Sequence, residues 1–222
     1  MEKVISWSHS ALKDYEGCPK RYQEVKVLKL YPYKETEATL YGNEFHKAAE
    51  LYIGEGKPLP AQFAYAQDVL DALSQIPGRK LVEYKMTLTK DLKPTTWFAK
   101  DAWVRGMADL LIINDDNLTA RVVDYKTGNN KYPDREQLRL MAMLVFAHFP
   151  HIRKVSSALL FVVKNDMVKA SMEVDAAEKE WWNYRERVAR IEQAHETGVW
   201  NPKASPLCPW CPVTTCVHHP KH

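Results

Sequence analysis

The fold of this sequence is decided by two segments, residues 104–113 (VRGMADLLII) and residues 118–126 (LTARVVDYK). Both are rich in aliphatic residues, and the intervening residues 114–117 (NDDN) are typical of a turn. The segments therefore predict a β-hairpin that is buried on both faces. Into it the sequence places three charged side chains, Asp109, Asp124 and Lys126. Burying an isolated charge costs several kcal/mol, so these three charges need compensation.

The hairpin geometry predicts where the charges meet. With Asp115 and Asp116 at the centre of the turn, Asp109 faces Val122 and Asp124 faces Met107. The two carboxylates then share one face as diagonal neighbours, roughly 7–8 Å apart at the backbone. At that distance they can bind one divalent cation, with the Lys126 ammonium beside it. The alternative is a buried salt bridge among the three residues.

The motif residues resemble those of the RecB-like branch of the PD-(D/E)XK nuclease superfamily. Residues 106–109 (GMAD) match the family's G-x-x-D motif, and residues 123–128 (VDYKTG) match its D-x-K motif with RecB-like flanks. The resemblance implies an α/β nuclease fold, a mixed central sheet flanked by helices. It implies that Asp109, Asp124 and the backbone carbonyl of Tyr125 bind Mg²⁺ or Mn²⁺ and that Lys126 assists the attacking water.

Further positions match the family pattern in part. Residues 42–46 (GNEFH) resemble its helical G-x-x-x-H motif, which implies that His46 joins the metal ligands. Glu83 stands where relatives often carry a glutamate, and it is either a further ligand or a solvated strand residue. Gln137 corresponds to the glutamine of Q-x-x-x-Y, a candidate DNA contact, but Met141 replaces the tyrosine. A helical histidine alone is more often structural.

Hydrophobic periodicity predicts the remaining elements. Helices are expected from Ser8 through Tyr22 and over residues 38–53, 61–73, 134–149 and 176–197. Strands are expected over residues 81–88 and 95–100, and a second hairpin over residues 155–163 and 167–174. Together these elements predict one mixed α/β domain over residues 1–222, with the two ends of the chain on one side.

The four cysteines lie near the two ends of the chain: Cys18, Cys208, Cys211 and Cys216. Four thiolates suffice for a tetrahedral zinc site or an iron–sulfur cluster. Cys208 and Cys211 also form a C-x-x-C pair, but a redox pair belongs on a strand-to-helix turn rather than in a proline-broken tail. His218 and His219 could substitute as zinc ligands.

The cysteine pattern resembles that of the CRISPR-associated RecB-like exonucleases and AddB-type nuclease domains. In those proteins one cysteine in a C-P-x-x-Y context precedes the core, as Cys18 does here, and a C-x-x-C-x(n)-C group follows it. The resemblance implies a [4Fe–4S] cluster bound by all four thiolates, in a subregion formed by residues 1–30 and 200–222. Zinc is the competing metal.

Composition and charge limit the classes of protein to which this sequence can belong. Apolar residues make up 45% and charged residues 27% of 222 residues, the profile of a globular domain. The longest apolar run is too short to cross a membrane, and residues 1–4 lack an apolar signal core, so a cytoplasmic location is expected. The net charge of +3 is too weak to establish nucleic-acid binding, and it does not exclude a local basic channel.

These observations predict a metal-dependent DNA nuclease, an exonuclease on single-stranded or end-containing DNA. Lys131 and Arg135, near Lys126, are candidate contacts to the DNA backbone or simply solvated surface residues. No Walker phosphate loop is present, so any unwinding requires a separate helicase; a recombinase or a CRISPR adaptation protein is another expected partner. The alternatives are a non-catalytic DNA-binding or assembly protein on the same fold and a structure-specific endonuclease.

Overall fold

The computed structural model describes residues 4–32, 34–129 and 131–220. The chain forms two compact units. The sheet unit comprises Met1–Ser6 and Glu35–Glu180, and the terminal unit comprises Trp7–Lys34 and Trp181–His222. Residues 1–3, on which the expected absence of a signal core depends, lie outside the described residues. The expectation of one domain over residues 1–222 stays a prediction.

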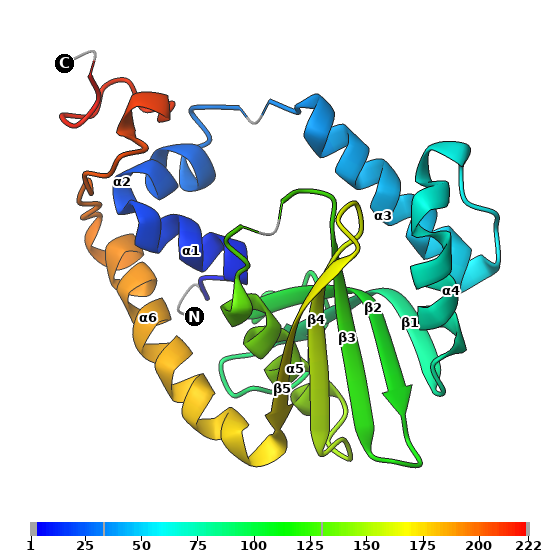
Figure 1. The fold of residues 1–222 in the computed structure, drawn as a ribbon. Helices are drawn as coiled ribbons and strands as arrows, with labels where there is room; N and C mark the ends of the chain where they lie inside the picture. The colour runs from blue at the N-terminus through cyan, green and yellow to red at the C-terminus, as the bar shows by residue number, and fades with distance from the viewer. Residues whose placement is uncertain (1–3, 33, 130, 221–222) are drawn as a thin grey trace. The chain divides into compact units, whose positions relative to one another are not determined.

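The sheet unit contains a five-stranded mixed sheet with the strands in chain order (Figure 1). Its strands are β1 (Arg79–Leu88), β2 (Val104–Asn114), β3 (Thr119–Lys126), β4 (Lys154–Phe161) and β5 (Asp166–Glu173). Only the β3–β4 pair is parallel, and α5 (Arg135–His148) connects these two strands. A parallel pair needs such a crossover, so the predicted α/β class with a mixed sheet is confirmed.

Helices cover both faces of this sheet. On one face, α3 (Glu37–Glu55) and α4 (Gln67–Gln75) share a core with alternate strand residues, among them Leu110 and Val123. On the other face, Leu138 of α5 packs against Leu159 and Phe161 of β4. Thus β4 alternates between the two cores, as a central strand must when both faces are buried.

Local sequence explains where the helices begin and end. The hydroxyl of Thr36 caps α3 by accepting a hydrogen bond from the Thr39 backbone N–H, and Gly56 ends the helix with φ of 68°. The carboxylate of Asp134 caps α5 in the same way. A side-chain acceptor at the start and glycine at the end are the usual helix boundaries.

Three expectations were wrong. Leu111 lies opposite Val122, so the partners of β2 and β3 are shifted by two residues from the prediction. The turn is therefore residues 115–118, and Leu118 adopts a φ of 50° in it. Residues 95–100 form no strand but belong to a loop of local turns that returns to the end of β1 through Thr95. The predicted helix over residues 61–73 begins as a 3₁₀ segment, η2 (Ala61–Ala66).

The terminal unit is helical. It contains α1 (His9–Gly17), α2 (Pro19–Tyr22), a π-helical turn η1 (Gln23–Val27), most of α6 (Ala177–Thr197) and the short η4 (Cys208–Trp210). The helix expected from Ser8 through Tyr22 is interrupted at Cys18, whose extended backbone precedes Pro19. The residue before a proline is disfavoured in the α region, which explains the break.

Contacts between distant sequence segments hold the terminal unit together. Trp7 stacks on Tyr184 with ring centroids 5.5 Å apart. The guanidinium of Arg187 donates two hydrogen bonds to Glu16, at 2.6 and 2.7 Å. Bidentate pairs of this kind are the strong class of charged contacts, so α1 and α6 are firmly joined within this unit. Among the described residues, no helix is both long and apolar enough to span a membrane.

Candidate active site

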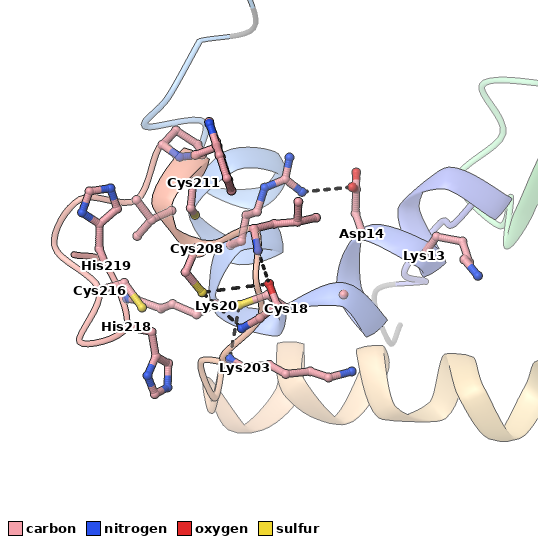
Figure 2. Close-up of a pocket in the computed structure, with 17 residues that line it drawn as sticks. Lys13, Asp14, Cys18, Lys20, Lys203, Cys208, Cys211, Cys216, His218 and His219 are labelled. Atoms are coloured by element: carbon pink, nitrogen blue, oxygen red, sulfur yellow. Dashed lines mark hydrogen bonds and ion pairs between the residues drawn. The ribbon is translucent and has the colours of Figure 1, made fainter. Parts of the chain in front are cut away.

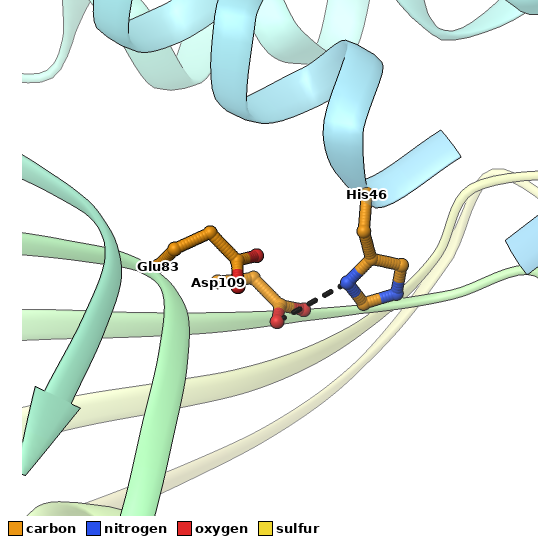
Figure 3. A group of neighbouring side chains, drawn as sticks. All are labelled: His46, Glu83 and Asp109. Carbon is orange, nitrogen blue, oxygen red and sulfur yellow. Dashed lines mark ion pairs between the residues drawn. The ribbon is translucent and has the colours of Figure 1, made fainter. Parts of the chain in front are cut away.

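Three side chains from three elements converge at the middle of β1 and β2. His46 of α3, Glu83 of β1 and Asp109 of β2 each offer a ligand atom, and these atoms lie within 4.8 Å of one another (Figure 3). His46 Nδ1 lies 3.2 Å from Asp109 Oδ1. Among the described residues no other group of this kind meets that distance. One nitrogen and two carboxylates form a donor set that suits a divalent cation such as Mn²⁺ or Mg²⁺.

The strands change faces at this point. Val82 and Leu110 pack on the α3 side of the sheet, with Val82 close to Gly54 of α3. Two residues after Val82, Tyr84 packs on Phe149 at the end of α5, and four residues before Leu110, Gly106 lies against the α5 side chains. Residues two apart on a regular strand share a face. On β1 and β2, therefore, side chains that would point to the α3 side of a regular sheet point to the α5 side beyond these positions.

Glu83 and Asp109 lie at the exchange. They would face each other in the ladder, but the ladder passes from Val82–Leu110 to Tyr84–Ala108 without pairing them. Glu83 has a φ of 48°, a left-handed conformation that is strained for a residue with a Cβ. Strain of this type is concentrated at functional sites, because the surrounding structure must hold it. The sequence left the role of Glu83 open, and its position opposite Asp109 is the signal that places it at the site.

Asp109 also fills a gap between β2 and β3. The ladder between these strands ends at Leu110–Val123, and two residues after Val123 the backbone N–H of Tyr125 donates to Asp109 Oδ2 at 2.6 Å. The Asp109 side chain is only 6% exposed. One carboxylate oxygen is thus fixed by the backbone, while the other faces His46.

Asp124 lies next to this group but has different contacts. Its Oδ2 lies 2.5 Å from Lys126 Nζ, and its Oδ1 accepts a hydrogen bond from Gln137 Nε2 at 2.5 Å. Of the four predicted catalytic residues, the structure joins His46 to Asp109 and Asp124 to Lys126. Gln137, whose contact with DNA stays a prediction, donates this hydrogen bond to Asp124.

The pKa values of several side chains are shifted in the candidate site. Burial and the charge of Asp109 raise the pKa of Asp124 against the opposing effect of Lys126. The same two causes, in the same order, raise the pKa of Glu83. Burial lowers the pKa of His46, but the hydrogen bond to Asp109 and the surrounding carboxylates outweigh it and raise that pKa overall. A bound cation would relieve this concentration of negative charge.

A cleft of about 470 Å³ opens beside these residues. His46 and Glu83 line it together with Met107 of β2 and Thr127, which follows β3. Gly42 lines the same cleft, and a Cβ there would lie 3.3 Å from Thr127 Oγ1. Glycine at this place lets α3 approach the end of β3 closely.

The remaining DNA-contact candidates lie on the surface. Lys131 and Arg135 are exposed, near the start of α5. Met141, which replaces the tyrosine of the family motif, is only 5% exposed. A Cβ on Gly106 would lie 3.1 Å from its sulfur, so Met141 packs against β2 and belongs to the core rather than to a DNA surface.

The four cysteines line one pocket of about 480 Å³ in the terminal unit (Figure 2). Two of the sulfurs accept hydrogen bonds from backbone N–H groups of the tail, Cys18 from Lys203 at 3.4 Å and Cys208 from Ser205 at 3.3 Å. No three of these sulfurs lie within 4.8 Å of one another in the described chain. They therefore do not form the compact tetrahedron of a zinc site, in which each sulfur lies ~2.3 Å from one ion.

Comparison with known proteins assigns the class of this fold and site. The PD-(D/E)XK nuclease superfamily matches residues 6–216, nearly the whole chain. The chain therefore belongs to this nuclease superfamily. No curated protein matches the sequence.

Solved structures resemble the chain at low identity. The crystal structure of a "Putative exonuclease" from Eubacterium rectale is 15% identical, with a TM-score of 0.54, and the match covers 93% of this chain and 86% of that one. The structure of SSO0001 is 13% identical, with a TM-score of 0.47, over 98% and 88% of the two chains. At this identity, the first similarity supports the fold alone.

Proposed function

We propose that this protein is a metal-dependent deoxyribonuclease, an exonuclease that hydrolyses single-stranded DNA or DNA with free ends. The observation that carries the proposal is the convergence of His46, Glu83 and Asp109 beside the Asp124–Lys126 pair. A protein that only binds DNA does not need several repelling carboxylates in one buried place, because their mutual desolvation is costly. The superfamily membership agrees with a nuclease function.

Each residue has a distinct part in the proposed site. His46, Asp109 and Glu83, with Asp124 and the backbone carbonyl of Tyr125, would hold a Mg²⁺ or Mn²⁺ ion. When bound, that ion would polarise the scissile phosphate and lower the pKa of a water molecule. Lys126 offers an ammonium that can orient the attacking water and stabilise negative charge developing on the phosphate. The Tyr125 N–H keeps Asp109 in place throughout.

The biological setting is also part of the proposal. The RecB-like resemblance favours a role in phage recombination, DNA processing or CRISPR adaptation, in the cytoplasm of a bacterial, archaeal or phage-infected cell. A separate helicase, recombinase or CRISPR adaptation protein would supply the DNA end. Lys131 and Arg135 are exposed beside α5 and would contact the DNA backbone.

A [4Fe–4S] cluster held by Cys18, Cys208, Cys211 and Cys216 completes the proposal. The four sulfurs line one pocket without converging on one point. In a four-iron cluster each thiolate binds a different iron atom, so the sulfurs are spread more widely than around one zinc ion. Lys13, Lys20 and Lys203 line the same pocket and would offset the negative charge of a cluster with four thiolates.

A nuclease assay tests the proposed function. End-labelled single- and double-stranded DNA is incubated with Mg²⁺ or Mn²⁺, with EDTA, and with Lys126→Ala in parallel. We expect metal-dependent degradation that EDTA stops and that Lys126→Ala slows by about 10²-fold or more. Absence of cleavage by wild-type protein that contains its metal would contradict the proposal and favour a non-catalytic DNA-binding or assembly protein.

Gln137→Ala is expected to weaken Mn²⁺ binding by about 10- to 100-fold, because its amide orients Asp124. Isothermal titration calorimetry without DNA measures the effect. Arg139→Ala, an exposed change on the same helix, is the control and should leave Mn²⁺ affinity unchanged. Unchanged Mn²⁺ affinity in Gln137→Ala together with weaker DNA binding would show that Gln137 contacts DNA directly.

A further inference from the structure

The loop between β1 and β2, residues 89–103, is long and has no regular secondary structure. Loops of this length in compact domains are usually functional. Its backbone is nevertheless well anchored, since Thr95 and Trp103 donate hydrogen bonds back to Thr87 and Leu88 of β1. The loop is therefore a fixed feature beside the sheet.

Two cations flank a tryptophan in this loop. Lys85 Nζ lies 5.6 Å and Arg105 Cζ 5.8 Å from the centre of the Trp97 ring. Arg105 Nε also donates a hydrogen bond to the Trp97 carbonyl at 2.7 Å. The loop thus holds an aromatic ring and two positive charges together.

The exchange of faces places this group on the same side of the sheet as the active site. Past the exchange, Met107 lines the cleft beside His46. Lys85 lies directly opposite Met107 in the ladder, and Arg105 lies two residues from Met107 on the same strand, so these side chains share its face. The Trp97 group therefore continues the surface that begins at the cleft.

Phe98, the next residue, is 88% exposed. Single exposed apolar residues are common, and alone this one would require no explanation. Here it follows in sequence a half-buried tryptophan that two cations flank, and Met107, which lines the cleft on the strand that carries Arg105, is 39% exposed. Exposed rings interleaved with cations are the usual means of binding single-stranded nucleic acid, since bases stack on the rings and phosphates meet the charges.

We propose that Phe98, Trp97, Lys85 and Arg105 form a stacking platform that binds single-stranded DNA next to the active site. The inference rests on the proposed nuclease function and names its substrate form. Bases of the strand stack on Phe98 and on the exposed part of Trp97, while Lys85 and Arg105 contact its phosphates. Duplex DNA, whose bases are already stacked on each other, gains little from such a platform.

Binding is tested by fluorescence anisotropy of a labelled oligo(dT) strand with the full-length protein in EDTA, where no cleavage occurs. Phe98→Ala and Phe98→Leu are expected to raise Kd by about 10-fold or more, while Phe98→Tyr keeps the ring and stays within about twofold of wild type. Because Phe98 is so exposed, these changes should leave the melting temperature unchanged. Trp182→Ala, another exposed aromatic residue, is the control.

Two further measurements separate stacking from charge. Lys85→Gln should lower the slope of log Kd against log salt by about 0.7, the value for one phosphate contact with a single strand. On a blunt duplex, Phe98→Ala should change Kd by less than about twofold. Wild-type affinity of Phe98→Ala for oligo(dT), or an equal loss on duplex and single strand, would overturn the platform.

The platform and the nuclease can fail separately. Hydrolysis of bis(4-nitrophenyl) phosphate, which has no bases, should be the same for Phe98→Ala and wild type. If wild type degrades single-stranded DNA and Phe98→Ala binds it equally well, the platform is wrong and the nuclease stands. If wild type hydrolyses no substrate but Phe98→Ala loses affinity for oligo(dT), the nuclease is wrong and the platform stands.

Discussion

Asp109→Asn is expected to slow metal-dependent DNA cleavage by about 10³-fold or more, which corresponds to about 4 kcal/mol. Asp109 contacts both His46 of α3 and the backbone of β3. One oxygen faces His46 at 3.2 Å, and the other accepts from the Tyr125 N–H at 2.6 Å. An asparagine can still accept that backbone hydrogen bond, but it removes the negative charge that a cation requires.

The same substitution should not destabilise the metal-free protein at pH 8. Burial and the charge of Asp109 raise the pKa of Glu83 and of Asp124. A carboxyl group whose pKa is raised on folding binds more protons in the folded state, so it lowers stability above the raised pKa and has no effect below its unfolded value. Removing the charge of Asp109 removes part of that penalty.

His46 contributes with the opposite sign. Burial lowers its pKa, but the hydrogen bond and charge of Asp109 raise it overall, so the pair stabilises the fold at low pH. That stabilisation is lost as pH rises through the raised pKa of His46. Asp109→Asn should therefore cost stability near pH 5 and cost little or nothing at pH 8.

Single-turnover cleavage rates and urea unfolding at both pH values test this prediction. Glu50→Gln, a change of a carboxylate that lines the same cleft, is the control and should retain most of the activity. Near-wild-type cleavage by Asp109→Asn would exclude Asp109 as a metal ligand. A large loss of stability at pH 8 would show instead that Asp109 is needed for folding.

The sequence indicated three residues of the candidate site because charges stand out in an aliphatic hairpin. Asp109, Asp124 and Lys126 interrupt segments that are otherwise apolar, and the α/β class followed from the order of helices and strands. The error in register, a shift by two residues, does not by itself move a side chain to the other face. The change of faces at Glu83 and Asp109 has a larger effect, because Asp109 contacts His46 of α3 whereas Asp124 accepts from Gln137 of α5.

Other features depend on backbone geometry that a residue pattern does not reveal. The turn of the hairpin was misplaced because Leu118, which looks like the start of a strand, adopts a left-handed conformation. The change of faces at Glu83 has no signature in residue types, so the side of the sheet on which Lys85 and Arg105 lie could not be predicted. Residues 95–100 have strand-like composition, but Pro94 and local turns hold them in a loop.

The cysteines were predicted to meet, and all four line one pocket in the terminal unit. Two chain ends must come together for this to occur. The Cys18 sulfur accepts from the Lys203 N–H, and Lys203 Nζ donates to the Glu16 carbonyl at 2.8 Å.

Cys18→Ser is expected to abolish binding of the proposed cluster and to lower the free energy of unfolding by several kcal/mol. A group bound by Cys18 and the tail closes a loop that contains nearly the whole chain. By analogy with a disulfide, such a closure is worth ~4–5 kcal/mol in unfolded-state entropy. Protein purified without oxygen should be brown and contain iron, and the Cys18→Ser variant should be colourless.

Metal analysis and urea unfolding of Cys18→Ser, Cys211→Ser and wild type provide the test. If all four thiolates hold one group, the two variants should lose iron to the same extent, since each removes one of four equivalent attachments. Ser205→Ala, which keeps the backbone N–H that donates to Cys208, is the control and should retain the metal. Full iron content in Cys18→Ser would show that Cys18, at the end of α1, does not bind the cluster. One equivalent of zinc in colourless wild-type protein would show that the cysteines bind a zinc ion and not a cluster.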